Sequence, residues 1–578
     1  MDSKPNFEFG QAHCLSPAVK STTELMMFRR SVFRPFCLLL SLLPFGCDVQ
    51  SAEPASGRPN LIFILTDDQR YDTLGCTGNQ FVQTPHLDQL AADGTLFANA
   101  SVTSAICTPS RACYFLGQYE RKHGVNFNSG TAMTQQAWSK GYPMVLRDAG
   151  YFTGYVGKNH VPIGPQGYDS DVIDHSFDFW YAGHGHLSFY PKRRHKIFEH
   201  AIADTQTEVV GEGAVSFLSN SAGFIEGADA FLQQRPANQP FCLSIACNLP
   251  HGSGTRSMEM LPTDPELYRT MFRDRMDQIG IPQTYVAADQ IRKPKLPADV
   301  LFSDFRQTNY DFVDSPELLK EQLVRKAQTI TGIDRMVGRI RTTLAEQGLA
   351  DNTVIIFTSD HGLMNGEFGL GGKALNYEAC LRVPMIVMDP RIDTDQRGRR
   401  SLALVQSIDI APTLIEYAGA DLPDEMQGHS LRPLVDGTTD SIRDVSFAEN
   451  LWSTYFGNPR IESVRTRDWK YIRYFENDRD QFASVTKKTL YQVSQSQIES
   501  YSRWLTSSIE GEAPVYEELF HLASDPSESV NLVARPIYAE RLQQMRQQCQ
   551  ASVTLAKGDV DQPSATIVVP EIREGKTK

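Results

Sequence analysis

Apolar residues gather into short unbroken runs along the first two thirds of the chain. The clearest run covers residues 61–65, and similar runs lie at 241–246, 354–357 and 384–388. A continuous apolar run of this length is typical of a strand buried on both faces of a parallel sheet. We therefore expect these runs to be strands of one large sheet.

A long helical pattern lies between the second and third apolar runs. Ser315 and Pro316 supply an N-cap and a first-turn proline, apolar residues then recur at intervals of three and four as far as Leu344, and Gly348 follows. This spacing predicts one amphipathic helix that ends at the glycine. Strands that alternate with helices predict an α/β fold with a large, mainly parallel central sheet flanked by helices.

The pattern changes after about residue 435. Segments 464–468 and 470–475 have the character of a strand hairpin, and 535–551 reads as an amphipathic helix. We therefore expect a smaller C-terminal subdomain of antiparallel sheet plus helix. The predicted division is a leader and signal peptide over 1–57, a large domain over 58–435, and a C-terminal subdomain and tail over 436–578.

One stretch of the large domain is weakly periodic. Residues 252–314 are rich in Pro, Asp and Arg. Long insertions of this kind commonly lie beside functional sites, so we expect an extended loop near the mouth of the active site.

The amino terminus has the features of an export signal. A basic stretch at Arg29, Arg30 and Arg34 precedes an apolar run over 36–43, and the small residues Ser51 and Ala52 follow. This is the pattern of a cleaved secretory signal. The run is too short to span a bilayer. We predict a periplasmic or extracellular protein with no membrane span, whose translation starts at Met26 or Met27.

The net charge and the cysteine content restrict the functions that this protein can have. The formal net charge is -13 and the sequence pI is about 5.5, which argues against nucleic-acid binding. An anionic substrate would need a local basic pocket. Of ten cysteines, three precede Ala52, and the odd, scattered remainder is no disulfide framework. At least one thiol is therefore unpaired or chemically altered.

Acidic residues follow two of the predicted strands directly. Asp67 and Asp68 come after the first run, and Asp360 and His361 come after the third. Ligands of open α/β sheets bind at the carboxyl ends of strands. Carboxylates crowded there favour a bound cation. The alternative for either motif alone is a set of solvated loop acids that cap helices.

Cys107 precedes a predicted helix start. Pro109 fits a first helical turn, and the helix continues through Ala112 to Gly117. The positive end of the helix dipole would favour an anion beside Cys107, and Arg111 adds a fixed positive charge. The alternative is a small cysteine that is simply buried in front of a helix.

The pentapeptide Cys107-Thr108-Pro109-Ser110-Arg111 resembles the modification signature of the type I, formylglycine-dependent sulfatases of the alkaline phosphatase-like superfamily. In that family a separate enzyme oxidises the cysteine to formylglycine. The resemblance extends from about residue 59 to about 532. Its further landmarks are Pro59–Ile62 with Thr66–Gln69, 84–88, Gly157-Lys158-Asn159-His160, Pro250-His251, Gly372-Lys373, Tyr377-Glu378, 382–384, 407–413, 427–431, 518–520, Asp525-Pro526 and Asn531-Leu532.

The resemblance implies a role for each matching position. The implied ligands of one Ca²⁺ ion are the modified Cys107 together with Asp67, Asp68, Asp360 and His361. Arg111 would hold the aldehyde hydrate, and His160 would bond the nucleophile and act as a base. The residues implied to contact the sulfate or leaving oxygens are Lys158, His251 and Lys373. Taken singly, each lysine could be a solvated residue and each histidine a buried structural one.

The implied function is sulfuric ester hydrolysis by attack on sulfur. Export and the family's habits point to a sulfated carbohydrate as substrate and to a formylglycine-generating enzyme as the partner during maturation. Two alternatives stay open. One is a phosphonate monoester or phosphodiester hydrolase that uses the same modified cysteine, and the other is an inactive glycan-binding relative in which Cys107 stays a thiol.

The chain departs from the family pattern at several positions. His361 stands where many members carry Asn, and because imidazole is a poor Ca²⁺ ligand, Mn²⁺ stays open. Residues 115–118 read Phe-Leu-Gly-Gln where the family has Leu-Thr-Gly-Arg, and Ser253 interrupts the Pro-His-x-Pro motif. The basic run 192–196 matches no motif; it is either a solvated face or an anionic glycan subsite.

Overall fold

The computed structural model describes residues 57–567, apart from 128–129, 202, 213–226, 255–257, 259, 298–299, 302–309, 453–456, 458, 477–493 and 559–564. The predicted signal peptide lies outside the described residues. No helix among the described residues combines the length and apolar character needed to cross a membrane. The seven cysteines of this part of the chain are all free, as expected from their odd, scattered placement.

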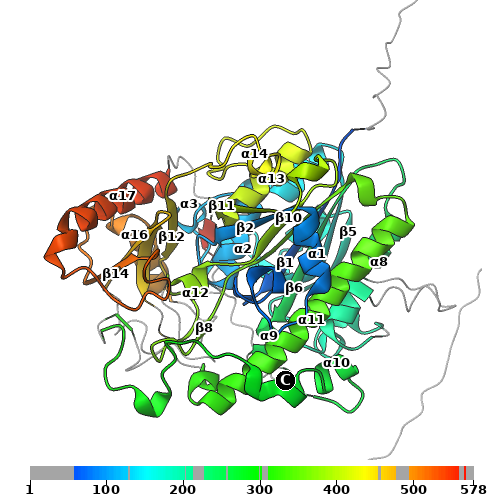
Figure 1. Ribbon diagram of the computed structural model, residues 1–578. Coiled ribbons are helices and arrows are strands. Elements are labelled where there is room, and N and C mark those ends of the chain that lie inside the picture. The colour runs from blue at the N-terminus through cyan, green and yellow to red at the C-terminus, as the bar shows by residue number, and fades with distance from the viewer. Residues whose placement is uncertain are drawn as a thin grey trace, which may run out of the picture. The chain divides into compact units, whose positions relative to one another are not determined.

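An eight-stranded sheet forms the centre of the fold, in the order β11-β2-β10-β7-β1-β6-β4-β5 (Figure 1). Every neighbouring pair is parallel except those of β10, which runs antiparallel to β2 and β7. The predicted α/β class with a mainly parallel sheet is confirmed. The strands are β1 (Asn60–Asp67), β2 (Thr95–Ser101), β4 (Phe152–Asn159), β5 (Phe179–His184), β6 (Phe241–Pro250), β7 (Thr353–Ser359), β10 (Met385–Met388) and β11 (Arg399–Gln406).

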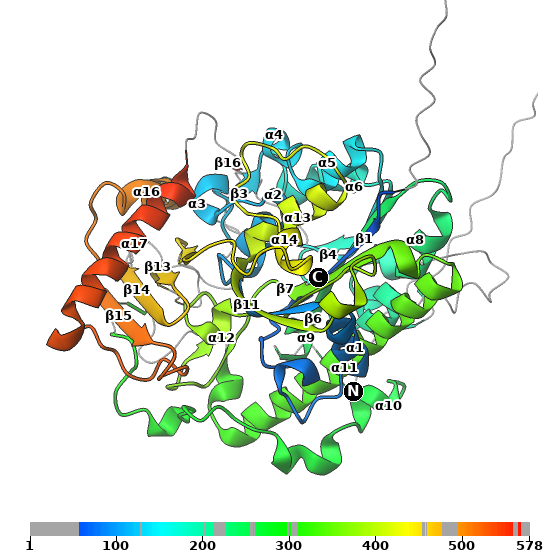
Figure 2. The ribbon, with the colours of Figure 1, turned by 45° about the horizontal axis from the view of Figure 1, so that its top comes forward.

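Helices cover both faces of this sheet, as the two views in Figures 1 and 2 show. Along β1, Leu61, Phe63 and Leu65 pack into one buried cluster, and Ile62 and Ile64 pack into another. The first cluster includes side chains from α2 (Cys107–Leu116), α5 (Tyr142–Asp148) and α13 (Ile410–Tyr417), and the second includes α1 (Pro85–Asp93), α8 (Gly227–Gln234) and α11 (Pro316–Glu346). Each fully buried aliphatic residue contributes about 1.5–3 kcal/mol. The unbroken apolar run therefore reflects burial on both sides.

Helix α11 follows the predicted boundaries closely. The Ser315 side chain accepts a hydrogen bond from the backbone N–H of Leu318 at 3.3 Å, and Pro316 occupies the first turn. The helix ends at Glu346, and Gly348 adopts a left-handed backbone with φ of 68°, a conformation that costs glycine little.

A four-stranded antiparallel sheet forms the C-terminal part of the fold, in the order β12-β13-β14-β15. Its strands are β12 (Ser446–Asn450), β13 (Arg460–Arg465), β14 (Trp469–Phe475) and β15 (Tyr516–His521), and its helices are α16 (Gln495–Ser507) and α17 (Ala539–Lys557). Met545, Cys549 and Val553 of α17 pack against Val464 and Tyr471 of the sheet. The predicted antiparallel subdomain is confirmed, and its boundary at 435/436 stays a prediction.

A buried arginine joins a short helix of the large domain to the smaller sheet. Arg121, in α3 (Glu120–His123), donates hydrogen bonds to Glu449 at 2.9 Å and to Glu462 at 2.5 Å. Arg121 is 1% exposed. Because an unpaired buried charge is costly, this arrangement fixes the smaller sheet against the segment that follows α2.

Candidate active site

The ends of β1 and β7 bring the acidic residues together. These strands are parallel neighbours in which Leu65 pairs with Thr358, and the backbone N–H of Asp360 donates to the carbonyl of Thr66 at 2.9 Å. Asp67 and Asp360 therefore emerge side by side. Asp68 has a left-handed backbone with φ of 60°, which aspartate tolerates better than most residues.

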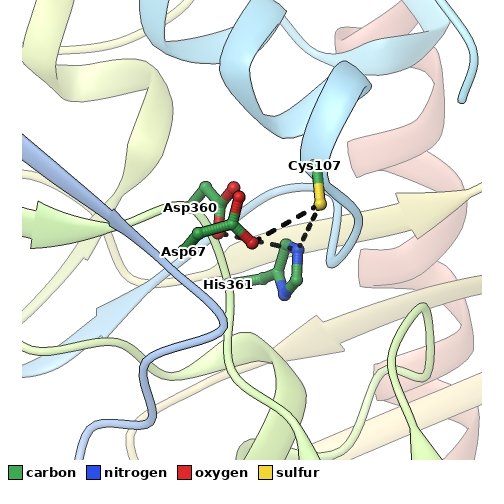
Figure 3. A group of neighbouring side chains, drawn as sticks. All are labelled: Asp67, Cys107, Asp360 and His361. Carbon is green, nitrogen blue, oxygen red and sulfur yellow. Dashed lines mark hydrogen bonds and ion pairs between the residues drawn. The ribbon is translucent and has the colours of Figure 1, made fainter. Parts of the chain in front are cut away.

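Cys107 is the first residue of α2 and is fully buried. Its Sγ lies 3.6 Å from Oδ1 of Asp67 and 3.3 Å from Nε2 of His361, as Figure 3 shows. One turn later the Ser110 hydroxyl donates to the carbonyl of Asp360 at 2.5 Å. This hydrogen bond ties the helix start to the end of β7.

Arg111 connects the same two strand ends. Its Nε donates to Oδ2 of Asp360 at 2.9 Å, and its Nη2 donates to Oδ2 of Asp67 at 3.1 Å and to the carbonyl of Cys247 at 3.3 Å. Burial alone would lower the pKa of Arg111, but the two carboxylates raise it above its ordinary value. Its Nη1 is buried without a hydrogen-bond partner among the described residues.

Two buried lysines complete the cationic part of the site. Lys158, from β4, donates to Oδ2 of Asp67, and Lys373 donates to Oδ1 of Asp68 at 2.9 Å. Nζ of Lys373 also lies 3.2 Å from Sγ of Cys107. Burial would raise the pKa of Asp67, but nearby positive charges, with that of Lys158 the strongest, hold it well below its usual range. Both lysines thus keep the carboxylates ionised.

Of the two predicted catalytic histidines, His160 is buried and His251 is partly exposed. Nε2 of His251 lies 3.8 Å from Oδ2 of Asp68, and burial lowers the pKa of His251 to about 4. His160 is 1% exposed, and burial followed by the charge of Lys158 lowers its pKa well below the ordinary value. Both imidazoles are therefore neutral near pH 7. No hydrogen bond between the described side chains joins His160 to Cys107, so that predicted contact stays a prediction.

The donor set fits a divalent cation. Asp67, Cys107, Asp360 and His361 each offer a ligand atom within 4.8 Å of the others, and Asp67, Asp68 and His251 form a second such group. Oδ2 of Asp68 is buried without a hydrogen-bond partner among the described residues. Because such an oxygen is costly unless it is paired, it is suited to ligate a bound cation. Carboxylates suit Ca²⁺, and the imidazole of His361 also admits Mn²⁺.

His186 is a site residue that the sequence analysis missed. Its Nδ1 lies 3.3 Å from both Nζ of Lys158 and Oδ1 of Asn248. Its ring centroid is 4.4 Å from that of His160 and 4.8 Å from that of His251. The sequence held a signal, because His184-Gly185-His186 stands at the carboxyl end of a parallel strand, β5.

The basic run 192–196 contacts these groups through His195, whose Nε2 lies 3.2 Å from the carbonyl oxygen of His186. Lys192 and Arg193 form ion pairs with Asp204 at 3.7 Å and 3.3 Å, and Arg193 stacks over Tyr190 at 4.5 Å. Arg193, Arg194 and Lys196 are exposed. These contacts favour the solvated face over an anionic glycan subsite.

The mainly parallel sheet, with its acids at adjacent strand ends and its cysteine at a helix start, defines the alkaline phosphatase-like class of α/β hydrolases. A family model described as Sulfatase matches residues 59–420, and one described as N-sulphoglucosamine sulphohydrolase, C-terminal, matches residues 366–490. The chain belongs to the sulfatase family. The sequence-based prediction of a sulfuric ester hydrolase is thereby confirmed.

A curated relative agrees with this assignment, and solved structures share the fold. The chain is 27% identical over 517 residues to the N-acetylglucosamine-6-O-sulfatase of Bacteroides thetaiotaomicron, covering 78% of this chain and 85% of that protein. A protein solved in complex with its substrate D-glucosamine-2-N,6-O-disulfate has a TM-score of 0.61 at 22% identity, covering 88% of this chain and 99% of that one. The phosphonate monoester hydrolase of Agrobacterium radiobacter has a TM-score of 0.60 at 21% identity, covering 86% and 96%. Likeness at this level of identity establishes a shared fold.

Proposed function

We propose that this sulfatase removes sulfate from a sulfated carbohydrate, with Cys107 oxidised to formylglycine as the centre of the reaction. The observation that carries the proposal is the set of distances at Cys107. Its Sγ lies between 3.2 and 3.6 Å from a lysine ammonium, an imidazole and a carboxylate. The curated relatives include the N-acetylglucosamine-6-O-sulfatase named above and an ulvan-active sulfatase of Formosa agariphila, which supports a carbohydrate substrate.

The site's own residues would divide the work of ester hydrolysis. Arg111, Lys158 and Lys373 hold fixed positive charge around Cys107, where the transferring sulfo group gathers negative charge. His251, neutral and partly open to solvent, would bind the leaving oxygen. His160, also neutral, would take up a proton in the step that releases sulfate.

Two groups are implied that the chain does not itself encode. At position 107 the formylglycine hydrate would supply two hydroxyls on one carbon, one as the nucleophile toward sulfur and one whose proton His160 would accept. A divalent cation, Ca²⁺ in the first instance, would be held by Asp67, Asp68, Asp360, His361 and the modified Cys107, and would neutralise the negative charge of the reacting group. A formylglycine-generating enzyme would act during maturation, and export would follow the signal at the amino terminus.

The test is a screen of sulfated mono- and oligosaccharides, with released sulfate as the readout. The protein is produced in its natural host, so that Cys107 meets its modifying enzyme. We expect sulfate release from at least one sugar, and none from the Cys107→Ala variant. Release at equal rates from both proteins would contradict the proposal.

The same preparation separates the two alternatives. Faster hydrolysis of an aryl phosphonate than of any sulfate ester would identify a phosphonate hydrolase. Mass analysis of the Cys107 peptide addresses the second alternative. An unmodified thiol in protein that binds sulfated sugars without cleaving them would identify a glycan-binding relative.

A further inference from the structure

A cavity of about 540 Å³ lies beside the reaction site. It is lined by residues 68–70, 72–73 and 77–82, by the segment 278–282 and by α11. Much of its wall is apolar, and its polar lining includes Asp68, Arg70, Lys326 and Asn365. Because Asp68 also belongs to the reaction site, the cavity opens next to the place where the ester sulfate would bind. Its volume suits a small ligand or one sugar ring.

Lys326 differs from every other buried lysine among the described residues. Lys158 pairs with Asp67, Lys373 with Asp68, and Lys470 with two glutamates. Lys326 is 7% exposed and lies within ion-pair distance of no carboxylate in the described part of the chain. Its Nζ lies 3.4 Å from Oδ1 of Asn365 and 5.3 Å from the centroid of the Phe312 ring.

Such a lysine is unusual because the burial of an ammonium group has a high desolvation free energy. Buried lysines are normally paired with a carboxylate. An amide oxygen at 3.4 Å and an aromatic face offset only part of that cost. An ammonium group carries three donors, so Lys326 keeps donors that a ligand in the cavity could use.

Arg70, the second cation of the cavity wall, already forms ion pairs with carboxylates. Arg70 donates to both oxygens of Asp72, at 3.0 and 2.9 Å, and to Glu367 at 2.5 Å. A carboxylate pair therefore offsets its charge. Lys326 is the cation of the described cavity lining that forms no ion pair with a carboxylate among the described residues.

The helix itself connects Lys326 to the reaction site. Thr329 lies one turn after Lys326, so both are on the same face of α11. Oγ1 of Thr329 lies 3.1 Å from Oγ of Ser253, in the short helix α9 (His251–Gly254) that begins with His251. Figure 1 shows α9 beside α11. The helix face that carries Lys326 therefore also contacts the short helix that carries His251.

We infer that this cavity is a subsite for a second anionic group of the substrate, a sulfate or a carboxylate, bound by the ammonium of Lys326. The inference rests on the proposed function, since the substrate is the same molecule whose ester sulfate lies at Cys107. The apolar wall would contact the sugar ring. The enzyme would then prefer doubly anionic sugars to singly anionic ones.

The test compares matched substrates in two arms. One arm pairs glucosamine 6-sulfate that carries an N-sulfate with its N-acetyl counterpart. The other pairs a disaccharide of 6-sulfated glucosamine and a uronic acid with its carboxyl-reduced form. The variants are Lys326→Met, Lys326→Arg and the control Lys320→Met, which is on α11 but outside the cavity.

We expect the wild type to prefer the doubly anionic member of at least one arm. Lys326→Met should lose about 10- to 100-fold in kcat/KM on that member and less than about twofold on its partner, the size expected for one charge-assisted hydrogen bond. Lys326→Arg should keep the preference, and Lys320→Met should change nothing. The arm that responds identifies the anion as sulfate or carboxylate.

Equal losses on both members of each pair, or a wild type without preference, would overturn the subsite while leaving the sulfatase proposal intact. A wild type that releases no sulfate would instead overturn the proposed function. Calorimetric binding to the Cys107→Ala protein, with and without Lys326→Met, gives a second readout. Equal affinity of these two proteins for the doubly anionic sugar would also exclude the subsite.

Discussion

Nζ of Lys373 lies 3.2 Å from Sγ of Cys107 and 2.9 Å from Oδ1 of Asp68. One ammonium thus contacts both the reacting side chain and a candidate cation ligand. Lys373→Met should lower kcat by about 100- to 1,000-fold, the usual effect of removing one preorganised donor to developing charge. Steady-state sulfate release measures this. Exposed Lys140→Met is the control, and similar losses in both variants would refute the role.

Replacing the sulfur of Cys107 should separate binding from turnover. Cys107→Ser keeps the shape of the site but lacks the thiol that an enzyme specific for cysteine oxidises to the aldehyde, so we expect substrate binding with no repeated turnover. Calorimetry and released sulfate measure the two properties. Cys113→Ser, on the same helix with its Sγ 3.3 Å from Nε2 of His123, should keep activity. Undiminished turnover in Cys107→Ser would contradict the mechanism.

Metal removal should destabilise the fold as well as abolish activity. Oδ2 of Asp68 has no hydrogen-bond partner among the described residues, so a bound cation would relieve a buried, unpaired oxygen. A ligand at 100 times its Kd stabilises by about 2.7 kcal/mol. A chelator should therefore lower Tm, and added Ca²⁺ should restore it in the wild type but not in Asp68→Asn. Exposed Asp351→Asn should respond like the wild type.

The contact between His186 and His160 should affect the pH dependence of kcat. Burial lowers the pKa of His160, and His186 covers one side of its ring. His186→Ala would admit water, so the pKa of His160 should rise toward its ordinary value. Because the base must be neutral, the acidic limb of the kcat profile should move to higher pH, with a loss of less than about twofold at pH 7 that grows steadily below about pH 6. Exposed His200→Gln should leave the profile unchanged.

A buried glutamate predicts a second pH effect, on stability. Burial and the neighbouring Glu449 raise the pKa of Glu120 to about 8 from 4.5. Between these values the folded state holds a proton that the unfolded state has released. In this range, each rise of one pH unit should therefore lower the free energy of unfolding by about 1.4 kcal/mol.

Glu120→Gln removes this titration while it can still accept from Ser104 and Tyr501, whose hydroxyls lie 2.9 and 3.3 Å from Glu120. Denaturant unfolding measures the free energy of unfolding at about pH 5 and about pH 8. Between these two pH values, this free energy should rise by about 3–4 kcal/mol in the variant relative to the wild type. Exposed Glu510→Gln should show no such gain. Parallel pH profiles for wild type and Glu120→Gln would contradict the assignment.

The sequence predicted the parts of the fold that local pattern encodes. The two-faced burial of β1, the cap at Ser315 and the helix start at Cys107 all follow from short-range spacing. The reversed direction of β10 could not be predicted, because an apolar run of four residues looks the same in either orientation. Residue pattern alone sets burial, and strand direction depends on the connections.

The site shows the same limit. The proximity of Asp67 and Asp360 could be predicted because parallel strands end at one edge of the sheet. The position of His186 could not be predicted, since its approach to Lys158 depends on where β5 adds to β4. Lys326 is equally hidden, because a lysine beside an apolar helical stripe commonly extends to solvent and here is covered by other segments.

The site around Cys107 can form only after β7 has been synthesised and has paired with β1. Cys107 leaves the ribosome roughly 250 residues before Asp360 and His361, the groups that later enclose it. At about 5–20 residues per second, this delay lasts on the order of 10 to 50 s. During that interval the thiol is still reachable, whereas in the finished fold it is fully covered. Any enzyme that oxidises Cys107 must therefore do so while the nascent chain is still incomplete or not yet folded.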